Sequence, residues 1–146
     1  MEKAEKIYFR VVRDTDGYPP VDVESVWATK RGVSEQYVLD NVPFFAKDAT
    51  IGDVVEARKE DGKKWFARII CRSPNSLIRI VFFDEGALER VNATLVGLGC
   101  STEYLKSHNV LAVSVPKPAT LEQVQDYLAQ ESSGGSLDYE EPILRI

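Results

Sequence analysis

The chain has 146 residues, of which 44% are hydrophobic and 28% charged, with a formal net charge of −5. This balance is typical of one globular domain and excludes a wholly disordered chain. Its apolar runs are too short to span a bilayer and its charged start, residues 1–6, lacks the apolar stretch of a secretory signal, so we predict a cytoplasmic protein.

The first half of the sequence predicts a series of short β-strands. Ile7, Phe9 and Val11 recur at a period of two, which is typical of a strand with one buried face. Residues 14–20 end this strand because they contain a glycine and two prolines, which favour turns. Further strands are predicted, in chain order, at residues 23–29, 36–39, 53–60 and 63–72.

The clearest hairpin is predicted around residues 61–62, an Asp-Gly pair that suits the positive φ angles of a type I′ turn. Strict alternation along the second strand of this hairpin places Lys64, Phe66 and Arg68 on one face. The same alternation places Ile69 on the opposite face.

The second half of the sequence changes to a mixture of strands and helices. Residues 77–83 form a continuous apolar strand, which is consistent with burial on both faces. Asp84 is the expected N-cap of a helix with an apolar face at helical spacing. Gly97 or Gly99 is expected to end this helix.

A second strand and helix are predicted after it. The strand covers residues 110–115. Thr120 with Gln123 has the spacing of a capping box at the start of the helix, whose apolar face is Leu121, Val124 and Leu128. Residues 131–136 are rich in Gly and Ser and predict a flexible linker. Residues 137–146 are expected either to add a strand or to trail as a tail.

These elements predict a single α+β domain over residues 1–130. Its β-rich part, residues 7–72, is expected to be a small SH3-like barrel or a bent antiparallel sheet. Its β-α-β-α part, residues 77–130, is expected to resemble half of a ferredoxin-like plait. Residues 131–146 are then the linker and the C-terminal tail.

Short motifs follow one another in a fixed order along the first half of the chain. They are residues 17–20 (GYPP), 24–28 (ESVWA), 39–46 (LDNVPFFA) and 52–55 (GDVV). In this order they resemble a bacterial family known as domain of unknown function 4265, and residues 76–79 (SLIR) match a strand later in its pattern. The resemblance covers roughly residues 7–130. It implies a bacterial, cytosolic protein of about this size and supplies no activity.

The motifs have two interpretations. In the first, they shape the fold, because Pro43 keeps the chain extended and Asx side chains fix turns by bonding to the backbone. In the second, Glu24, Trp27, Asp40 and Phe45 form the rim of a binding groove. The first interpretation is favoured because fold-shaping motifs are commoner than sites.

The sequence contains little that indicates catalysis. His108 is the only histidine, and its spacing from Cys100 matches no catalytic signature for a nucleophilic pair. Neither cysteine has a CxxC neighbour, and glycine-rich phosphate or dinucleotide motifs are lacking. We expect no metal, no cofactor and no catalytic residues, although an enzyme of unknown type stays open as an alternative.

A basic segment indicates nucleic acid as one candidate partner. Residues 58–79 carry a net charge of +5, whereas residues 1–57 carry −4 and residues 80–146 carry −6. A basic β-surface with an aromatic residue can hold a phosphate backbone and stack a base. The candidate residues for this patch are Lys64, Phe66, Arg68 and Arg72. The acidic remainder of the chain weakens this hypothesis.

Protein binding is the function that the sequence favours. A small, acidic chain without a catalytic constellation is typical of proteins that bind a basic partner electrostatically. The sharpest form of this hypothesis is an immunity or inhibitor protein that neutralises a bacterial toxin or effector. The oligomeric state stays open. The expected acidic surface consists of Asp84, Glu85, Glu89, Glu122, Asp126, Asp138, Glu140 and Glu141.

Overall fold

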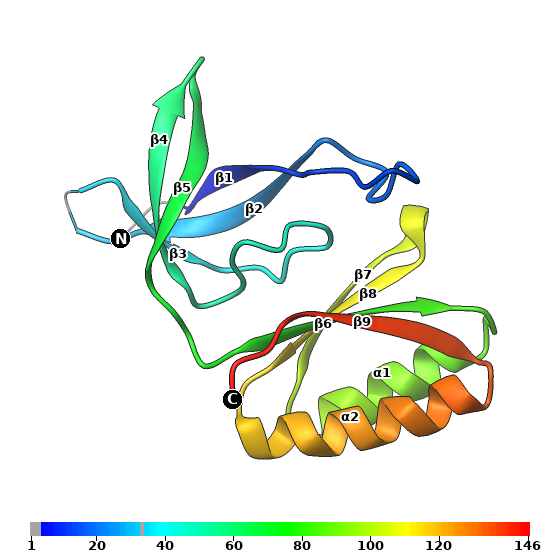
Figure 1. Ribbon diagram of the computed structural model, residues 1–146. Helices are drawn as coiled ribbons and strands as arrows, with labels where there is room; N and C mark the ends of the chain where they lie inside the picture. Colours follow the sequence, from blue (N-terminus) through cyan, green and yellow to red (C-terminus); the bar gives the residue numbers. More distant parts are fainter. Residues whose placement is uncertain (1–3, 33) are drawn as a thin grey trace. The chain divides into compact units, whose positions relative to one another are not determined.

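Figure 1 shows the computed structural model of the chain, which describes residues 4–32 and 34–146. The chain divides into two compact units, Met1–Ser73 and Pro74–Ile146, each with its own hydrophobic core. Residues 1–3 of the predicted domain and residue 33, in the connection after the predicted strand 23–29, lie outside the described residues. Helices and largely antiparallel sheets make up the described ranges, so the predicted α+β class is confirmed.

The described part of the first unit is a closed β-barrel. Sequence neighbours pair antiparallel, and a short parallel pairing between the first and last strands closes the barrel. Its inward positions follow the period of two, since Ile7, Phe9, Val26 and Ala28 are all buried. The strands are β1 (Ala4–Arg10), β2 (Val23–Lys30), β3 (Gln36–Leu39), β4 (Val54–Glu60) and β5 (Lys63–Cys71).

The hairpin β4–β5 confirms the predicted turn and corrects the predicted alternation. Asp61 and Gly62 have φ angles of 53° and 79°, as a type I′ turn requires. Register shifts interrupt the pairing, however, so that Phe66 lies opposite Ala57 while Ile69 lies opposite Val55. Phe66 and Ile69 therefore both pack on the barrel core, because the shift between Glu56 and Ala57 falls between them, inserts one extra residue and reverses the alternation once.

The described second unit is a sheet with helices packed on one face (Figure 1). Its strand order is β7-β8-β6-β9, and each neighbouring pair is antiparallel. The helices return the chain across the sheet between β6 and β7 and between β8 and β9. The elements are β6 (Ser76–Phe82), α1 (Ala87–Gly97), β7 (Ser101–Leu105), a 3-10 helix (Lys106–His108), β8 (Val110–Val115), α2 (Pro118–Ser133) and β9 (Leu137–Ile143).

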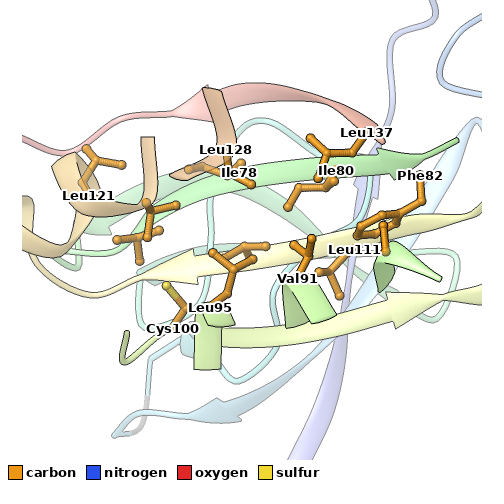
Figure 2. Packing of buried hydrophobic residues seen from close by; sticks show 14 residues of the cluster. Ile78, Ile80, Phe82, Val91, Leu95, Cys100, Leu111, Leu121, Leu128 and Leu137 are labelled. Carbon is orange, nitrogen blue, oxygen red and sulfur yellow. The ribbon is translucent and has the colours of Figure 1, made fainter. Parts of the chain in front are cut away.

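The core of the second unit lies between the sheet and the helices, as Figure 2 shows. Val91 and Leu95 from α1 and Leu121 and Leu128 from α2 belong to one core cluster on the helix-covered face of the sheet, and all are at most 2% exposed. These positions recur at helical spacing, so the predicted apolar faces correspond to the buried faces. The tight packing of sheet and helices here fixes the backbone frame of the candidate site described below.

Several predicted boundaries in the second unit are wrong. The N-cap of α1 is Gly86, and Asp84 instead accepts a hydrogen bond from the Gly86 backbone N–H at 3.0 Å. The N-cap of α2 is Lys117, ahead of the predicted Thr120, because Pro118 has the fixed φ that suits the first helical position.

The predicted linker is also wrong. Residues 131–133 complete α2, and the Gly134-Gly135 turn leads directly into β9, where Gly135 has a φ of 80°. Of the alternatives for residues 137–146, the structure has the added strand, which pairs with β6. Strand β7 was not predicted, because Ser101–Leu105 is short and lacks a clear alternation.

Candidate functional site

A surface pocket of about 750 Å³ lies at one end of the second unit. Its volume lies in the range of small-molecule and side-chain binding pockets. It is built where β6 ends, α1 begins and β7 turns into the 3-10 helix. The lining residues are Phe82, Phe83, Glu85, Leu88, Tyr104, Lys106 and Asn109.

Aromatic side chains make one wall of this pocket accessible to a partner. Phe83 follows the last residue of β6 and is 69% exposed, and Tyr104 of β7 is 38% exposed. A single exposed apolar side chain is common on protein surfaces, so Phe83 is of interest because it adjoins Tyr104 and Leu88 on the lining of one pocket. Leu88 from α1 adds a half-buried aliphatic side chain.

The backbone around the pocket is held by a polar residue in an unusual conformation. Asn109 has a φ of 53°, in the left-handed region that asparagine tolerates better than most residues. Its Nδ2 donates to the carbonyl oxygen of Phe82 at 2.7 Å, and its Oδ1 accepts from the Tyr104 hydroxyl at 2.9 Å. The backbone N–H of Phe83 donates to the carbonyl of Ser136 at 2.9 Å. The pocket therefore has a preformed wall rather than a loose loop.

Part of the predicted acidic surface gathers at this pocket. Glu85 lines it just before α1, Asp84 lies beside Phe83 in the sequence, and Glu89 lies in the first turn of α1. All of them are exposed. Lys106 is a basic residue on the lining, so the acidic character is concentrated on the α1 side of the pocket.

The remaining predicted acids are distributed over α2 and β9. Glu122 and Asp126 are exposed on α2, and Asp138 is exposed on β9. Glu140 lies 3.4 Å from the Nη1 atom of buried Arg79, and Glu141 accepts from Gln125 at 2.6 Å. Glu140 and Glu141 thus hold β9 in place, which reduces what they can offer to a partner.

The residues of the proposed N-terminal groove hold a loop against the barrel. The Glu24 carboxylate accepts hydrogen bonds from the backbone N–H groups of Phe44, Phe45 and Ala46, at 2.5, 2.9 and 2.8 Å. Asp40 accepts from the Thr29 hydroxyl at 2.8 Å. These contacts agree with the interpretation that the motifs shape the fold.

Phe45 and Trp27, the other two residues of the proposed groove, differ in their exposure. Phe45 is 3% exposed and meets the Tyr18 ring edge-on, with the ring centroids 6.4 Å apart. Trp27, by contrast, is 48% exposed on β2, with the Nζ of Lys6 5.1 Å from its ring centroid. A pocket of about 150 Å³, lined partly by Pro19 and Phe45, lies beside this loop.

The register shift between Glu56 and Ala57 separates Arg68 from Lys64 and Phe66, which keep their alternation but face the barrel interior. Phe66 stacks on Phe9 inside the barrel, with the ring centroids 4.9 Å apart. Arg68 is exposed and lies 3.3 Å from the Glu56 carboxylate. Arg72 is exposed after the end of β5. The predicted single face with Lys64, Phe66 and Arg68 together is therefore wrong.

Lys64 is engaged inside a network of polar groups. Its Nζ lies 3.0 Å from Glu5 and 3.6 Å from Glu35, and it also bonds to the Tyr37 hydroxyl. Burial opposes its charge, but hydrogen bonds to Tyr37 and Glu5 outweigh burial and raise the pKa of Lys64. The hydrogen bond from the Tyr37 hydroxyl lowers the pKa of Glu35, while burial raises the pKa of Tyr37. Lys64 thus stabilises the barrel.

Cys100 and His108, considered above as a nucleophilic pair, lie in environments that do not suit nucleophilic chemistry. Cys100 is 6% exposed, and burial raises the pKa of its thiol to about 11. A nucleophilic cysteine needs the opposite shift, because the thiolate is the reactive form. His108 is exposed, and its Nδ1 lies 3.0 Å from the Ser107 hydroxyl. Among residues 4–32 and 34–146, no group of three or more His, Cys, Asp or Glu is arranged to hold a metal ion, and no helix is long and apolar enough to cross a membrane.

Sequence reasoning missed most of the pocket. Tyr104 lies on the strand that was not predicted, and Asn109 was not a candidate residue. The available signal was Phe83, an aromatic residue directly followed by Asp84 and Glu85. An apolar residue placed just beyond a strand and next to acids is a candidate for exposure.

Comparisons with known proteins identify the fold and the family. No curated protein matches the chain. A solved structure described as the novel crystal structure of a hypothetical protein from Neisseria gonorrhoeae is similar in fold, with a TM-score of 0.78. The two sequences are 19% identical, and the match covers 99% of this chain and 97% of the other. A family model described as Domain of unknown function (DUF4265) matches residues 24–139, so the chain belongs to this family, as the ordered motifs indicated.

Proposed function

We propose that this protein binds another protein through the pocket at Phe83, with the acidic residues at the start of α1 facing a basic segment of the partner. The observation that carries the proposal is the exposed Phe83 ring in a preformed pocket beside Asp84, Glu85 and Glu89. Exposed aromatic residues surrounded by polar ones are common centres of binding energy in protein interfaces. The partner is expected to insert an apolar side chain flanked by Lys or Arg.

The charge of the second unit supports a basic partner. Residues 74–146 contain 10 acidic and 5 basic residues, whereas residues 1–73 contain 13 of each. Such a charge excess speeds the approach of a cationic surface. A toxin or effector neutralised by an immunity protein in the cytoplasm is the specific partner class we propose, because such pairs combine charge steering with an apolar anchor.

The proposal also includes a finer placement of the fold. The order β-α-β-β-α-β and the strand order β7-β8-β6-β9 support a ferredoxin-like plait for the second unit. Short strands that close between β1 and β5 support an SH3-like barrel for the first. Since both folds serve many functions, the pocket and not the fold carries the functional argument.

The test compares partner recovery by single variants of the tagged full chain, expressed in the source cell and treated with nuclease. Phe83→Ala removes the exposed ring, while Val96→Ala removes a 51% exposed apolar side chain elsewhere on α1. We expect Phe83→Ala to weaken binding of the recovered partner by about 2 kcal/mol, or roughly thirtyfold, and Val96→Ala to leave it unchanged. Equal recovery with both variants would place the interface elsewhere.

Charge variants test the electrostatic part with the purified partner. Glu85→Lys and Glu89→Lys are expected to slow association and weaken its salt dependence. Glu122→Lys makes the same charge change on α2 and is expected to have a smaller effect. Association rates that do not respond to any of these variants would contradict the assignment of the acidic rim.

A further inference from the structure

The outer face of the barrel carries aromatic and basic side chains where β5, β1 and β2 adjoin. Ile7 and Phe9 of β1 point into the core, so Lys6, Tyr8 and Arg10 point outward. This face differs from the patch that strict alternation predicted for β5 alone. The outer face depends on the register of β1 with β2 and β5, which alternation along one strand does not predict.

Strand register places aromatic rings across this face. Tyr8 of β1 pairs with Trp65 of β5, and their ring centroids lie 5.6 Å apart. On the other side of β1, Lys6 pairs with Trp27 of β2, whose side chain is 48% exposed. The rings therefore come from three different strands, which are separated in the sequence but adjacent in the sheet (Figure 1).

Each ring is accompanied by a cation. The guanidinium carbon of Arg10 lies 4.0 Å from the centroid of the Trp65 ring. The Nζ of Lys63 lies 5.2 Å from the Tyr8 ring, and that of Lys6 lies 5.1 Å from the Trp27 ring. Cation–π contacts position these groups without neutralising their charge.

Nearby acids compensate only part of this charge. Glu60 lies 3.6 Å from Arg10, but both side chains are more than 60% exposed, so the pair is weak and a phosphate can replace the carboxylate. Glu5 is committed to the partly buried Lys64. Arg58 lies opposite Trp65 in the β4–β5 pairing and adds a further exposed cation next to this face, although Glu56 lies 3.9 Å from it.

We propose that this face, formed by Lys6, Tyr8, Arg10, Trp27, Lys63 and Trp65, binds single-stranded nucleic acid. Cations beside exposed aromatic rings are what unpaired strands require, because phosphates need positive charge and bases stack on π-faces. Trp27, the most exposed ring of the set, stacks a base, while Arg10 and Lys63 contact phosphates. An acidic peptide would use the cations but has no need of the rings, so the aromatic component favours nucleic acid.

The experiment measures binding of fluorescently labelled oligothymidylate and oligouridylate to the full chain at several salt concentrations. Trp27→Ala removes the stacking ring, and Trp27→Phe keeps a smaller one. Lys63→Glu reverses a cation on this face, and Arg72→Glu makes the same change at an exposed arginine after β5. Thermal unfolding of each variant checks that the fold is retained.

We expect the wild type to bind single strands more tightly than the matching duplex. Trp27→Ala weakens binding about tenfold, and Trp27→Phe restores most of the loss. Lys63→Glu weakens binding and lowers the slope of log affinity against log salt by about 0.7, whereas Arg72→Glu changes neither strongly.

Several outcomes would overturn the proposal. The first is the absence of binding at low salt to either oligonucleotide. Equal losses with Lys63→Glu and Arg72→Glu, or wild-type affinity in Trp27→Ala, would show non-specific charge attraction instead of a stacking surface. Complete displacement of the oligonucleotide by polyglutamate at equal charge concentration would assign the face to acidic polypeptides. None of these outcomes bears on the Phe83 pocket, which lies in the other unit.

Discussion

The two units of this chain differ in charge and in how they hold their cores. The barrel unit contains 13 basic and 13 acidic residues, while the second unit contains 5 and 10, so the second unit accounts for the whole net charge of −5. An average over the chain therefore describes neither unit. The negative net charge of the whole chain weakened the hypothesis of nucleic-acid binding. This net charge does not apply to the barrel unit, where the basic and aromatic face lies.

The units also use polar groups differently. In the barrel, Glu24 and the buried Asp53 accept backbone hydrogen bonds and fix the long segment between β3 and β4. In the second unit, helices and strands satisfy most of the backbone by themselves, and Glu131 ties them together through side chains. The barrel depends on carboxylates as acceptors for loop backbone, because its loops are long relative to its strands.

The largest contrast between the units is expected in the reactivity of their cysteines. Cys71 of the barrel unit is exposed, whereas Cys100 is buried and the pKa of its thiol is raised from 9.0 to about 11. This shift alone lowers the thiolate fraction about a hundredfold at mildly alkaline pH. We expect a disulfide reagent to modify one thiol rapidly in the native protein and both in denaturant. Cys71→Ser and Cys100→Ser variants assign the phases, and rapid native labelling of Cys100 would contradict its burial.

The next largest effect is expected at the carboxylate that holds the barrel loop. Glu24→Ala leaves the backbone N–H groups of Phe44, Phe45 and Ala46 without their acceptor. We expect the free energy of unfolding to fall by about 2 kcal/mol, measured by urea denaturation with tryptophan fluorescence, since both tryptophans lie in the barrel unit.

A matched variant shows whether this loss is specific to the loop contact. Glu60→Ala removes an exposed glutamate whose contact with Arg10 is expected to contribute less than about 1 kcal/mol. Glu24→Gln keeps one acceptor oxygen, so its free energy of unfolding should lie between those of Glu24→Ala and Glu60→Ala. Equal stability of Glu24→Ala and Glu60→Ala would show that the loop is held by other contacts.

The smallest effect is expected in the acid dependence of the second unit. Glu131 bonds Arg90 at 2.8 Å and the Ser136 hydroxyl at 2.8 Å, and these contacts lower its pKa below 4.5. A carboxylate with a lowered folded-state pKa contributes stability above its unfolded-state pKa, and this contribution is lost as the pH falls through the folded value. The difference in unfolding free energy between wild type and Glu131→Gln should therefore shrink as the pH falls below about 4.5.

Urea denaturation followed by circular dichroism measures this difference, because the helices of the described residues all lie in the second unit. Glu122→Gln, an exposed change on the same helix, serves as the control and should stay within about 0.5 kcal/mol of wild type at each pH. A difference for Glu131→Gln that is constant down to about pH 3 would show that the Arg90 contact does not control its titration.

Local patterns predicted most of the elements because burial imposes a period on the sequence. Ile7 and Phe9 marked β1, Leu121, Val124 and Leu128 marked α2, and residues 61–62 marked the hairpin turn. Strand β7 escaped prediction because only part of it is buried, so its five residues carry no clear alternation. The glycines after α2 were read as a linker, although they form a tight turn into β9.

The candidate sites were less predictable than the elements. The acids at Asp84, Glu85 and Glu89 were named from the sequence, but the exposed Phe83 ring and the supporting Asn109 were not. The basic hairpin was named from its charge, yet Phe66 and Lys64 face the barrel interior and one register shift places Arg68 on the other side. A site depends on which side chains from different helices and strands lie together. The local pattern of residues along the sequence does not contain that information.

By itself the sequence determined the α+β class, the family and most strands and helices, since these follow from local periodicity, turn chemistry and ordered motifs. Only the tertiary structure decided which surface each charged or aromatic residue belongs to. The register of β1 between β2 and β5 brings Trp27, Tyr8 and Trp65 onto one face, although Trp27 and Trp65 are nearly forty residues apart in the sequence. Register is set by burial of a whole barrel core, so the outward face is a consequence of packing between distant strands.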